Sequence, residues 1–396
     1  MSQVSAAVGR HPEPPCSVPS AAAARLTVEV KRDLDLPPED AAALGALLES
    51  RPPVAVFLSN AWLSGFFAEP PDGFEPALVL LREGSTLRGV APIAVRQTLT
   101  HARVALLGGG AGSDRTDLIA ARGFEAACSD SLLSWLGETF GKGFVLELRD
   151  VPSDSSLWGA VHRASAERSL RLTLQPREIH TLPFLDLAEV WSAAAGPAPL
   201  PWPARSLDKH RRWLERRGPL RIERLEDLDE VMDAFASLVR LLRARWATRE
   251  GGSALDDPRA LRFHRHVIPL LLRERHLRMI RLSAGARTIA VFYGVARSGW
   301  WGYCLAGYDR EWAGRIHLGQ ITLATAIDLA AQEGATEFDF LKGAHRVKYL
   351  WPVRERATLD AEVYSEKAGP QLARAAWASR ETAAAFGKSA RDVVSS

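Results

Sequence analysis

The segment that decides the fold reads WWGYCLAGYDREWAGRIHLGQ at residues 300–320 and EFDFLKG at residues 337–343. Its aromatic and apolar residues predict a strand over 300–305 and another over 337–341, with a helix over 319–332 between them. A strand, a helix and a strand in this order indicate an α/β layered domain.

The loop between the first strand and the helix has the features of an anion site. It runs from Tyr308 to Leu318 and brings Gly319 to the first turn of the helix. Unpaired backbone N–H groups and the helix dipole favour negative charge at such a turn. Gly314 and Gly319 allow close approach, and Arg315 adds positive charge. These residues indicate a site suited to a pyrophosphate.

The same order of elements occurs twice along the chain. Each half is expected to run strand, two helices, hairpin, strand, helix and strand, with the copies about 190 residues apart, which indicates an internal duplication. Coincidence of a common α/β order is the alternative. The expected elements are 25–30, 40–49, 62–67, 77–95, 104–117, 124–140 and 144–149 in the first half and 220–224, 225–246, 258–275, 277–295, 300–305, 319–332 and 337–341 in the second.

Length and composition suggest the domain boundaries. A chain of 396 residues exceeds the usual size of one packed unit, so two domains are expected. Prolines at positions 197, 199, 201 and 203 predict an extended connector, and a short, very basic helix is expected over 207–217. The predicted organisation is a disordered lead at 1–24, an N-terminal domain at 25–190, the connector and basic helix at 191–219, a C-terminal domain at 220–365 and a helical tail at 366–396.

Charge and cysteine content argue against several classes of protein. A net charge of +3, from 50 basic and 47 acidic residues, argues against a general polyanion binder. Cys16, Cys128 and Cys304 lack the spacing of a disulfide framework or a zinc site, so no metal is expected. No apolar run reaches the length of a membrane span, and the N-terminus lacks the pattern of a secretory signal. We therefore expect a cytoplasmic protein.

A longer pattern surrounds the deciding segment. It includes the runs Gly307-Tyr-Asp-Arg-Glu-Trp312, Leu318-Gly319, Asp339-Phe-Leu-Lys-Gly343 and Lys348 with Trp351. Further runs upstream are Arg245-Trp246, Asp256-Asp-Pro258, Arg262-Phe-His264, Ser59-Asn-Ala-Trp62 and Gly89-Val-Ala-Pro92. Over about residues 50 to 360 the chain thus resembles the CelD-type acetyltransferases, which are tandem GNAT-fold proteins related to the Fem-type peptidoglycan aminoacyltransferases.

The resemblance implies a fold and an activity. The implied fold is α/β, with two tandem GNAT-like mixed-sheet domains and helices on both faces. The implied activity transfers an acyl group, expected to be acetyl, from CoA to an amine or hydroxyl of a small-molecule or saccharide acceptor, with acyl-CoA as co-substrate. The donor's pantetheine arm would pair with backbone in a gap between the strands at 300–305 and 337–341, and the acceptor would bind between the halves. Where the family commonly has Ser-Pro-Gly before the donor helix, this chain has His317-Leu318-Gly319.

The deciding segment and the loop after it supply the candidate catalytic residues. Asp339 alternates with two phenylalanines and is expected either to face the gap or to form a buried ion pair with Lys342, Lys348 or an arginine. The two lysines could bind phosphate or stabilise negative charge, or else lie at a solvated strand end. Tyr303 could protonate the leaving thiolate or simply pack, and His345 could relay protons. The candidates are thus Asp339, Lys342, Lys348, Tyr303 and His345.

Two further groups of residues are candidates for binding. The donor-binding candidates surround the start of the predicted helix and are Gly307, Arg315, His317, Leu318, Gly319 and Gln320. A Gly-rich run at 108–112 either shapes an acceptor groove or is a plain flexible loop. With that run, the acceptor-binding candidates are Asp114, Asp117, Arg245, Trp246 and Trp351.

Two other functions fit the same sequence. A Fem-like enzyme would take its acyl group from aminoacyl-tRNA, and the basic helix at 207–217 would then touch RNA; otherwise that helix is a solvated, charged surface and nucleic acid is not expected as a partner. A non-catalytic scaffold in a polysaccharide or natural-product pathway would keep the fold without turnover. For the enzyme we expect direct attack on the thioester, because nothing near Cys304 activates its thiol.

Overall fold

A computed structural model describes residues 26–110, 112–166, 170–192, 212–216, 219–247, 252–313, 316–343 and 345–377. The predicted disordered lead, most of the connector and basic helix, and both Gly314 and Arg315 of the predicted anion site lie outside these residues. The side chain of Trp246 is also outside the description. Of the predicted tail, residues 366–377 are described, and 368–377 are helical.

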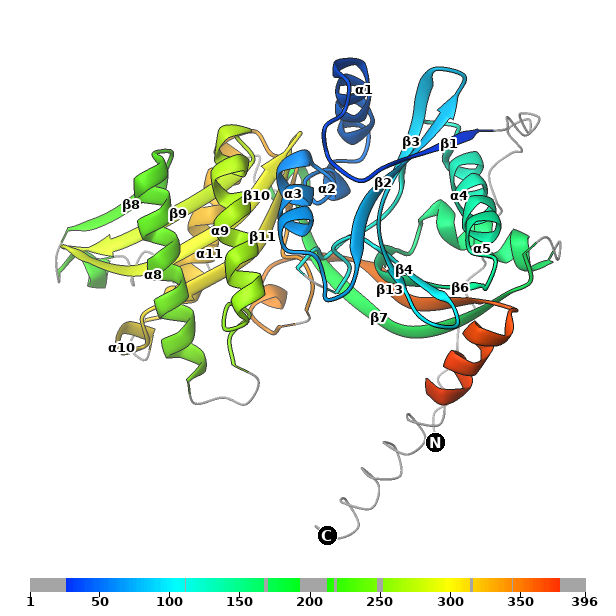
Figure 1. Ribbon diagram of the computed structural model, residues 1–396. Helices are drawn as coiled ribbons and strands as arrows, with labels where there is room; N and C mark the ends of the chain where they lie inside the picture. The colour runs from blue at the N-terminus through cyan, green and yellow to red at the C-terminus, as the bar shows by residue number, and fades with distance from the viewer. Residues whose placement is uncertain are drawn as a thin grey trace, which may run out of the picture.

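The strands form one 13-stranded sheet in the order β1-β2-β3-β4-β6-β13-β7-β12-β11-β10-β9-β8, with β5 paired to β3 (Figure 1). The strands are β1 Thr27–Lys31, β2 Glu75–Glu83, β3 Thr86–Gln97, β4 Ala102–Leu106, β5 Ile119–Ala120, β6 Phe144–Pro152, β7 Leu172–Asp186, β8 Leu220–Leu225, β9 Leu277–Ala284, β10 Arg287–Arg297, β11 Trp300–Tyr308, β12 Glu337–Asp339 and β13 Arg354–Ser365.

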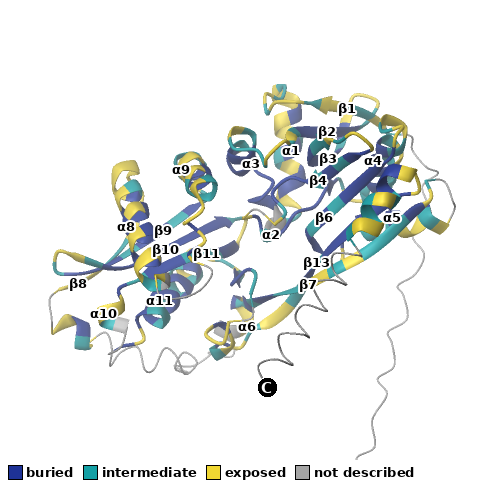
Figure 2. Cartoon of the chain, turned by 60° about the horizontal axis from the view of Figure 1, so that its bottom comes forward, coloured by how far each residue is buried: buried dark blue, intermediate teal, exposed yellow. Residues whose placement is uncertain are grey.

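Helices cover both faces of this sheet, as the buried faces of the strands show in Figure 2. One core lies under α1, α2, α3, α8 and α9; on the opposite face, α4 and α5 cover the first half and α11 covers the second. The helices are α1 Pro38–Glu49, α2 Pro52–Ala55, α3 Asn60–Ala68, α4 Glu125–Thr139, α5 Ser156–Ala166, α6 Leu187–Ser192, α8 Leu228–Trp246, α9 Pro258–Arg273, α10 Arg310–Ala313, α11 Leu318–Gln332 and the short 3₁₀ helix η1 Lys348–Leu350.

Alternating apolar residues explain how one sheet carries two cores. In β2, Leu78 and Leu80 face the core under α1 to α3, while Val79 and Leu81 face the core under α4 and α5. This two-residue period is that of a strand buried on both faces. The predicted class, an α/β mixed sheet with helices on both faces, is confirmed.

The last strand of each half is exchanged with the other half. β4 pairs with β6 in parallel, and β11 pairs with β12 in parallel, as two copies of one motif would. However, β13 lies between β6 and β7, and β7 pairs with β12. The two halves therefore share backbone hydrogen bonds along the middle of a single sheet. The sequence did not predict β7, β13, β5 or α5.

The halves also meet through α3 and α9. The rings of Phe66 and Phe263 lie 4.5 Å apart, and Trp62 packs edge-on against Phe263 at 5.2 Å. Gly65 permits this approach, because a side chain there would collide with Phe263 and Val267. Within the described residues, no helix combines the length and apolar character needed to cross a membrane.

Candidate active site

β11 and β12 part after three pairs of residues. Their parallel register runs from Trp300 opposite Glu337 to Gly302 opposite Asp339, and β12 ends there. β11 continues to Tyr308, paired only with β10 among the described strands. Residues 303–305 are consequently half-buried in the middle of a large sheet. The divergence that the resemblance implied is present.

A β-bulge in β11 turns side chains toward both faces of the gap. Tyr293 of β10 lies opposite Leu305 and Gly294 lies opposite Tyr303, so Cys304 is an extra residue. Cys304 and Leu305 line a cavity on the α9 face, while Tyr303 and Ala306 line one on the α11 face. Bulges commonly redirect side chains beside active sites. Both cavities are thus lined by neighbouring residues of β11 just beyond Gly302, its last residue paired with β12.

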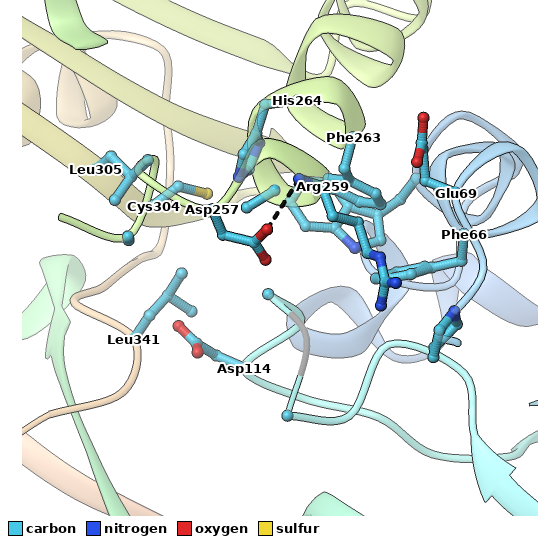
Figure 3. Close-up of a pocket in the computed structure, with 16 residues that line it drawn as sticks. Phe66, Glu69, Asp114, Asp257, Arg259, Phe263, His264, Cys304, Leu305 and Leu341 are labelled. Atoms are coloured by element: carbon cyan, nitrogen blue, oxygen red, sulfur yellow. Dashed lines mark hydrogen bonds between the residues drawn. The ribbon is translucent and has the colours of Figure 1, made fainter. Parts of the chain in front are cut away.

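The larger cavity lies between the halves and has a volume of about 510 Å³ (Figure 3). The Gly-rich run contributes Gly110 and Gly112, whose φ values of 70° and 109° favour glycine. The cavity is lined by Trp62, Phe66, Glu69, Pro71, Gly110, Gly112, Asp114, Ala254, Asp257, Arg259, Ala260, Phe263, His264, Cys304, Leu305 and Leu341.

Asp114 is the ionisable group of this cavity best placed for proton transfer. It lies half-buried on the loop between β4 and β5, and its carboxylate accepts a hydrogen bond from the backbone N–H of Lys342 at 3.3 Å. Burial raises the pKa of Asp114 to about 6. A carboxyl group with such a pKa can accept a proton near neutral pH.

Two other groups of the larger cavity are held in one protonation state. Burial lowers the pKa of His264 to about 4, so its ring is neutral, and Nδ1 lies 3.2 Å from the hydroxyl of Tyr293. Burial raises the pKa of the Cys304 thiol far above its usual value, and the negative charges of Asp114 and Asp339 act in the same direction. The thiol therefore stays protonated and is a poor nucleophile.

The smaller cavity, of about 120 Å³, lies between β11 and the start of α11. Tyr303 stacks on Phe292 with ring centroids 5.5 Å apart, and burial raises the pKa of Tyr303 to about 12. The Arg245 guanidinium lies 4.5 Å from the centre of the Tyr308 ring. This places Tyr303, Arg245 and Gly319 around one cavity, where Tyr303 can donate a proton.

Asp339 does not line either cavity. Its side chain is 0% exposed and forms an ion pair with Arg115, and it also accepts from Trp300 Nε1 at 3.4 Å and Leu341 N at 2.8 Å. Of the two predicted interpretations, the geometry agrees with the buried ion pair. The partner is an arginine from the other half of the molecule, and neither lysine.

The two candidate lysines hold backbone and carboxylate groups. Lys348 is buried, and its Nζ donates to the carbonyls of Phe340, Leu341 and Lys342 at 2.8, 3.1 and 2.9 Å. Burial lowers the pKa of Lys348 to about 8, so the ammonium is largely retained at pH 7. Lys342 Nζ lies 2.7 Å from Asp150 Oδ1. All three donors of Lys348 are thereby used by the turn that follows β12.

The other predicted residues that the structure describes line neither cavity. Gly307 packs against α8, Leu318 and Trp351 are buried in the core under α11, and Asp117 is buried with its carboxylate bonded to Ser155. His317 and His345 are exposed, and Gln320 is half-buried near the start of α11. The structure thus brings together Tyr303, Gly319 and Arg245 around the smaller cavity and places Asp114 in the larger one.

Sequence reasoning missed three residues that the structure makes important. Arg115 was not singled out, although it follows Asp114 directly. Asp257 and His264 lie within runs that resemble the family, but nothing local in the sequence assigns either a role in the site. The Asp257-Pro258 pair was a usable signal, since Asp before Pro is typical of a helix start. Asp257 indeed caps α9 by accepting from Arg259 N at 2.9 Å.

One cluster of side chains has the composition of a metal site. Asp150, His180 and Asp360 place possible ligand atoms within 4.8 Å of one another. Lys342 already pairs with Asp150, and Arg149 lies 3.4 Å from Asp360, so cations of the chain compensate this cluster.

The described part of the predicted basic helix packs inward. Trp213 lies edge-on against Trp312 with ring centroids 5.7 Å apart. Leu214 is 0% exposed. These two apolar side chains anchor the segment at 212–216 to the C-terminal half, while its charged residues Arg212, Glu215 and Arg216 are exposed.

Comparison with known proteins agrees with this architecture. Residues 204–349 match a family model described as an acetyltransferase (GNAT) domain, which is less than half of the chain. Among curated proteins no sequence matches this chain.

Three solved structures show the same fold over most of the chain. FemX superposes with a TM-score of 0.57 at 11% identity, covering 86% of this chain and 98% of that one. A conserved protein of unknown function from Bacteroides thetaiotaomicron gives 0.52 at 10%, covering 86% and 99%. The C-terminal domain (DUF2156) of a putative lysylphosphatidylglycerol synthetase from Agrobacterium fabrum gives 0.50 at 11%, covering 85% and 94%.

At these identities the likeness shows the fold alone. The fold and the matched domain together make this a GNAT-fold protein, and acyl transfer is the general class of reaction that the domain supports. GNAT folds generally bind acyl-CoA.

Proposed function

We propose that the protein transfers an acyl group from CoA to an amine or hydroxyl acceptor by direct attack, in the manner of the CelD-type acetyltransferases that it resembles. The observation that carries this proposal is the gap between β11 and β12, with one cavity on each face. A donor on the α11 face and an acceptor on the α9 face could then meet at residues 303–305.

The residues around the smaller cavity fit an acyl-CoA. Beyond Gly302, β11 offers a backbone edge toward the gap, and Gly319 in the first turn of α11 lines the cavity. A helix start favours the negative charge of a pyrophosphate. When bound, the thioester would supply an activated acyl carbon. A cytoplasmic location, where acyl-CoA is available, suits this role.

The chain's own groups could complete the reaction without an acyl-enzyme. Asp114 would accept the proton that the acceptor loses as its nitrogen or oxygen bonds to the acyl carbon. The carbon–sulfur bond breaks, and Tyr303 would give its proton to the leaving sulfur and recover one from water. Cys304 stays a protonated thiol throughout. Holding the two reactants together at the gap would supply much of the rate acceleration.

Ligand-induced stabilisation separates this proposal from the Fem-like alternative. We expect CoA to raise the melting temperature of the full chain, because a ligand that binds only the folded state stabilises it. Aminoacyl-tRNA should have no such effect. Release of free thiol from acetyl-CoA, dependent on an added acceptor, then tests turnover. Stabilisation by aminoacyl-tRNA alone would favour the Fem-like enzyme, and binding of CoA without turnover of any acyl-CoA would favour a scaffold.

A further inference from the structure

The larger cavity has an excess of negative charge. Three carboxylates, Glu69, Asp114 and Asp257, line it with one guanidinium, that of Arg259. Glu69 accepts two hydrogen bonds from Arg262, at 2.7 and 2.9 Å, so its charge is compensated.

The single guanidinium is compensated as well. Arg259 pairs with Asp72 outside the cavity. No cationic side chain of the described residues forms an ion pair with Asp114 or Asp257, each of which accepts a backbone N–H. Lys342 and Lys348, the nearest ammonium groups to Asp114, are bonded to Asp150 and to backbone carbonyls.

The two uncompensated carboxylates lie at different depths. Figure 3 shows them on opposite sides of the cavity, Asp257 at the start of α9 and Asp114 on the loop after β4. Asp257 is exposed, whereas Asp114 is half-buried near Leu341 and Cys304. Charges of one sign along a cleft attract ligands of the opposite sign and repel ligands of the same sign.

The remaining wall is mainly apolar. Phe66, Phe263, Leu305 and Leu341 line the cavity. Trp62 lines it too, and its indole N–H donates to Ser113 Oγ at 2.8 Å. His264 is neutral and bonded to Tyr293. Such a wall offers few hydrogen bonds to the many hydroxyls of a sugar, and buried polar groups without partners cost free energy.

We infer that the acceptor is a primary amine, cationic in solution, carried on an apolar body, and that anionic acceptors and nucleotide-linked sugars are excluded. Asp257 attracts the ammonium at the mouth and Asp114 binds it near the gap. For the transfer step this inference rests on the proposed function. One ammonium proton passes to Asp114 and then to water. The neutral nitrogen attacks the acyl carbon and gives its second proton to Asp114 as the carbon–nitrogen bond forms, while the carbon–sulfur bond breaks and the sulfur leaves as a thiol with the proton of Tyr303.

The binding test uses the full chain without acyl-CoA, so it does not depend on turnover. Calorimetry would compare 2-phenylethylamine with its neutral analogue 2-phenylethanol, the anion 3-phenylpropanoate and the polar amine glucosamine. We expect 2-phenylethylamine to bind about tenfold tighter than each of the other three compounds, a difference in binding free energy of about 1.4 kcal/mol. Equal or tighter binding of the alcohol, the anion or the sugar, or no binding of any probe, overturns the inference.

Matched variants test which carboxylates bind the amine. Asp114→Asn should weaken amine binding about tenfold. Asp257→Asn, which keeps the helix cap, should weaken it about threefold at low salt and less at high salt. Asp227→Asn changes the cap of α8 in the same way and should leave amine binding unchanged. Equal amine affinity in all three variants would also overturn the inference.

Turnover separates this inference from the proposed function. Amine binding that depends on Asp114, without thiol release from any acyl-CoA, would leave the inference standing and remove the proposed function. Acyl transfer to 2-phenylethanol or glucosamine in preference to 2-phenylethylamine would support the proposed function and overturn the inference about the acceptor.

Discussion

Arg115 and Asp339, which are 224 positions apart in the chain, form a buried ion pair that joins the loop after β4 to the end of β12. Asp114, next to Arg115, lines the larger cavity, and so does Leu341, two residues after Asp339. The pair therefore fixes two walls of the candidate acceptor site, one from each half, and acts through position instead of touching a ligand.

Removing either partner of this pair should destabilise the protein. Arg115→Ala or Asp339→Ala would leave the other charge buried and unpaired, so we expect each to lower the free energy of unfolding by about 3–5 kcal/mol. The double variant should cost less than the sum of the two, because neither charge is then left alone. Urea unfolding measures all three.

The control for this pair is Arg163→Ala. Arg163 and Asp130 form an ion pair whose side chains are 43% and 47% exposed. Exposed ion pairs contribute about 0–1 kcal/mol to the free energy of unfolding, so Arg163→Ala should change it by no more than that. A fully stable Asp339→Ala protein without acyl transfer would instead give Asp339 a direct chemical role.

Lys348 should likewise be important for stability. Leu341 has a φ of 58°, an uncommon conformation for a residue with a side chain. The Lys348 ammonium donates to the carbonyl of Leu341 and to those of the residues before and after it. We expect Lys348→Met to lower the free energy of unfolding by about 2–4 kcal/mol, since two buried carbonyls and one half-buried carbonyl lose their donor. Lys31→Met, at the sheet edge, should change it by less than about 0.5 kcal/mol. Normal stability of Lys348→Met with lost turnover would contradict a structural role.

Asp114 should set the acidic limb of the pH profile. As a base it must be ionised, and its raised pKa of about 6 means that activity grows as pH rises through 6 and then levels off. Asp114→Asn should lose about 100-fold or more in kcat/KM. Because any ionisation of the amine is common to both proteins, the ratio of wild type to Asp114→Asn should itself rise through about pH 6.

Asp117 provides the control for that profile. Burial raises the pKa of Asp117 to about 6 as well, but its carboxylate bonds to Ser155 and the backbone of Leu118, and it lines neither cavity. Asp117→Asn should keep the acidic limb, whatever it does to stability. Loss of the limb in Asp117→Asn and its survival in Asp114→Asn would reverse the assignment.

The order of the elements could be predicted where the apolar pattern is strong. β11, α11 and β12 were expected within a few residues of their observed bounds, because each carries a dense run of apolar residues. β7 escaped prediction because it contains Pro176 and several charged residues. In the structure, the register between β7 and β13 shifts beside Pro176, so the proline sits at an irregularity that tolerates its missing N–H.

The candidate site could be predicted only in part, because it depends on contacts between residues that are far apart in the sequence. The alternation of side chains correctly predicted that Asp339 faces the other side of the strand from the phenylalanines that flank it. No local signal could identify Arg115 as its partner, because this ion pair depends on how two distant loops meet. The exchange of β7 and β13 between the halves is hidden for the same reason, because strand pairing is decided by the whole sheet. The cavity between the halves follows from both features.

The smaller cavity should be sensitive to a single methyl group at Gly319. A Cβ there would lie 2.9 Å from the Tyr308 ring, which must then move toward the space proposed for the donor. We expect Gly319→Ala to raise KM for acyl-CoA about tenfold, or about 1.4 kcal/mol, with kcat less affected. Gly45→Ala, in α1 with nothing within 4 Å of its new Cβ, gains the same helix propensity and should leave KM unchanged. Equal KM values for the two variants, measured by thiol release at varied acetyl-CoA, would mean that the donor binds elsewhere.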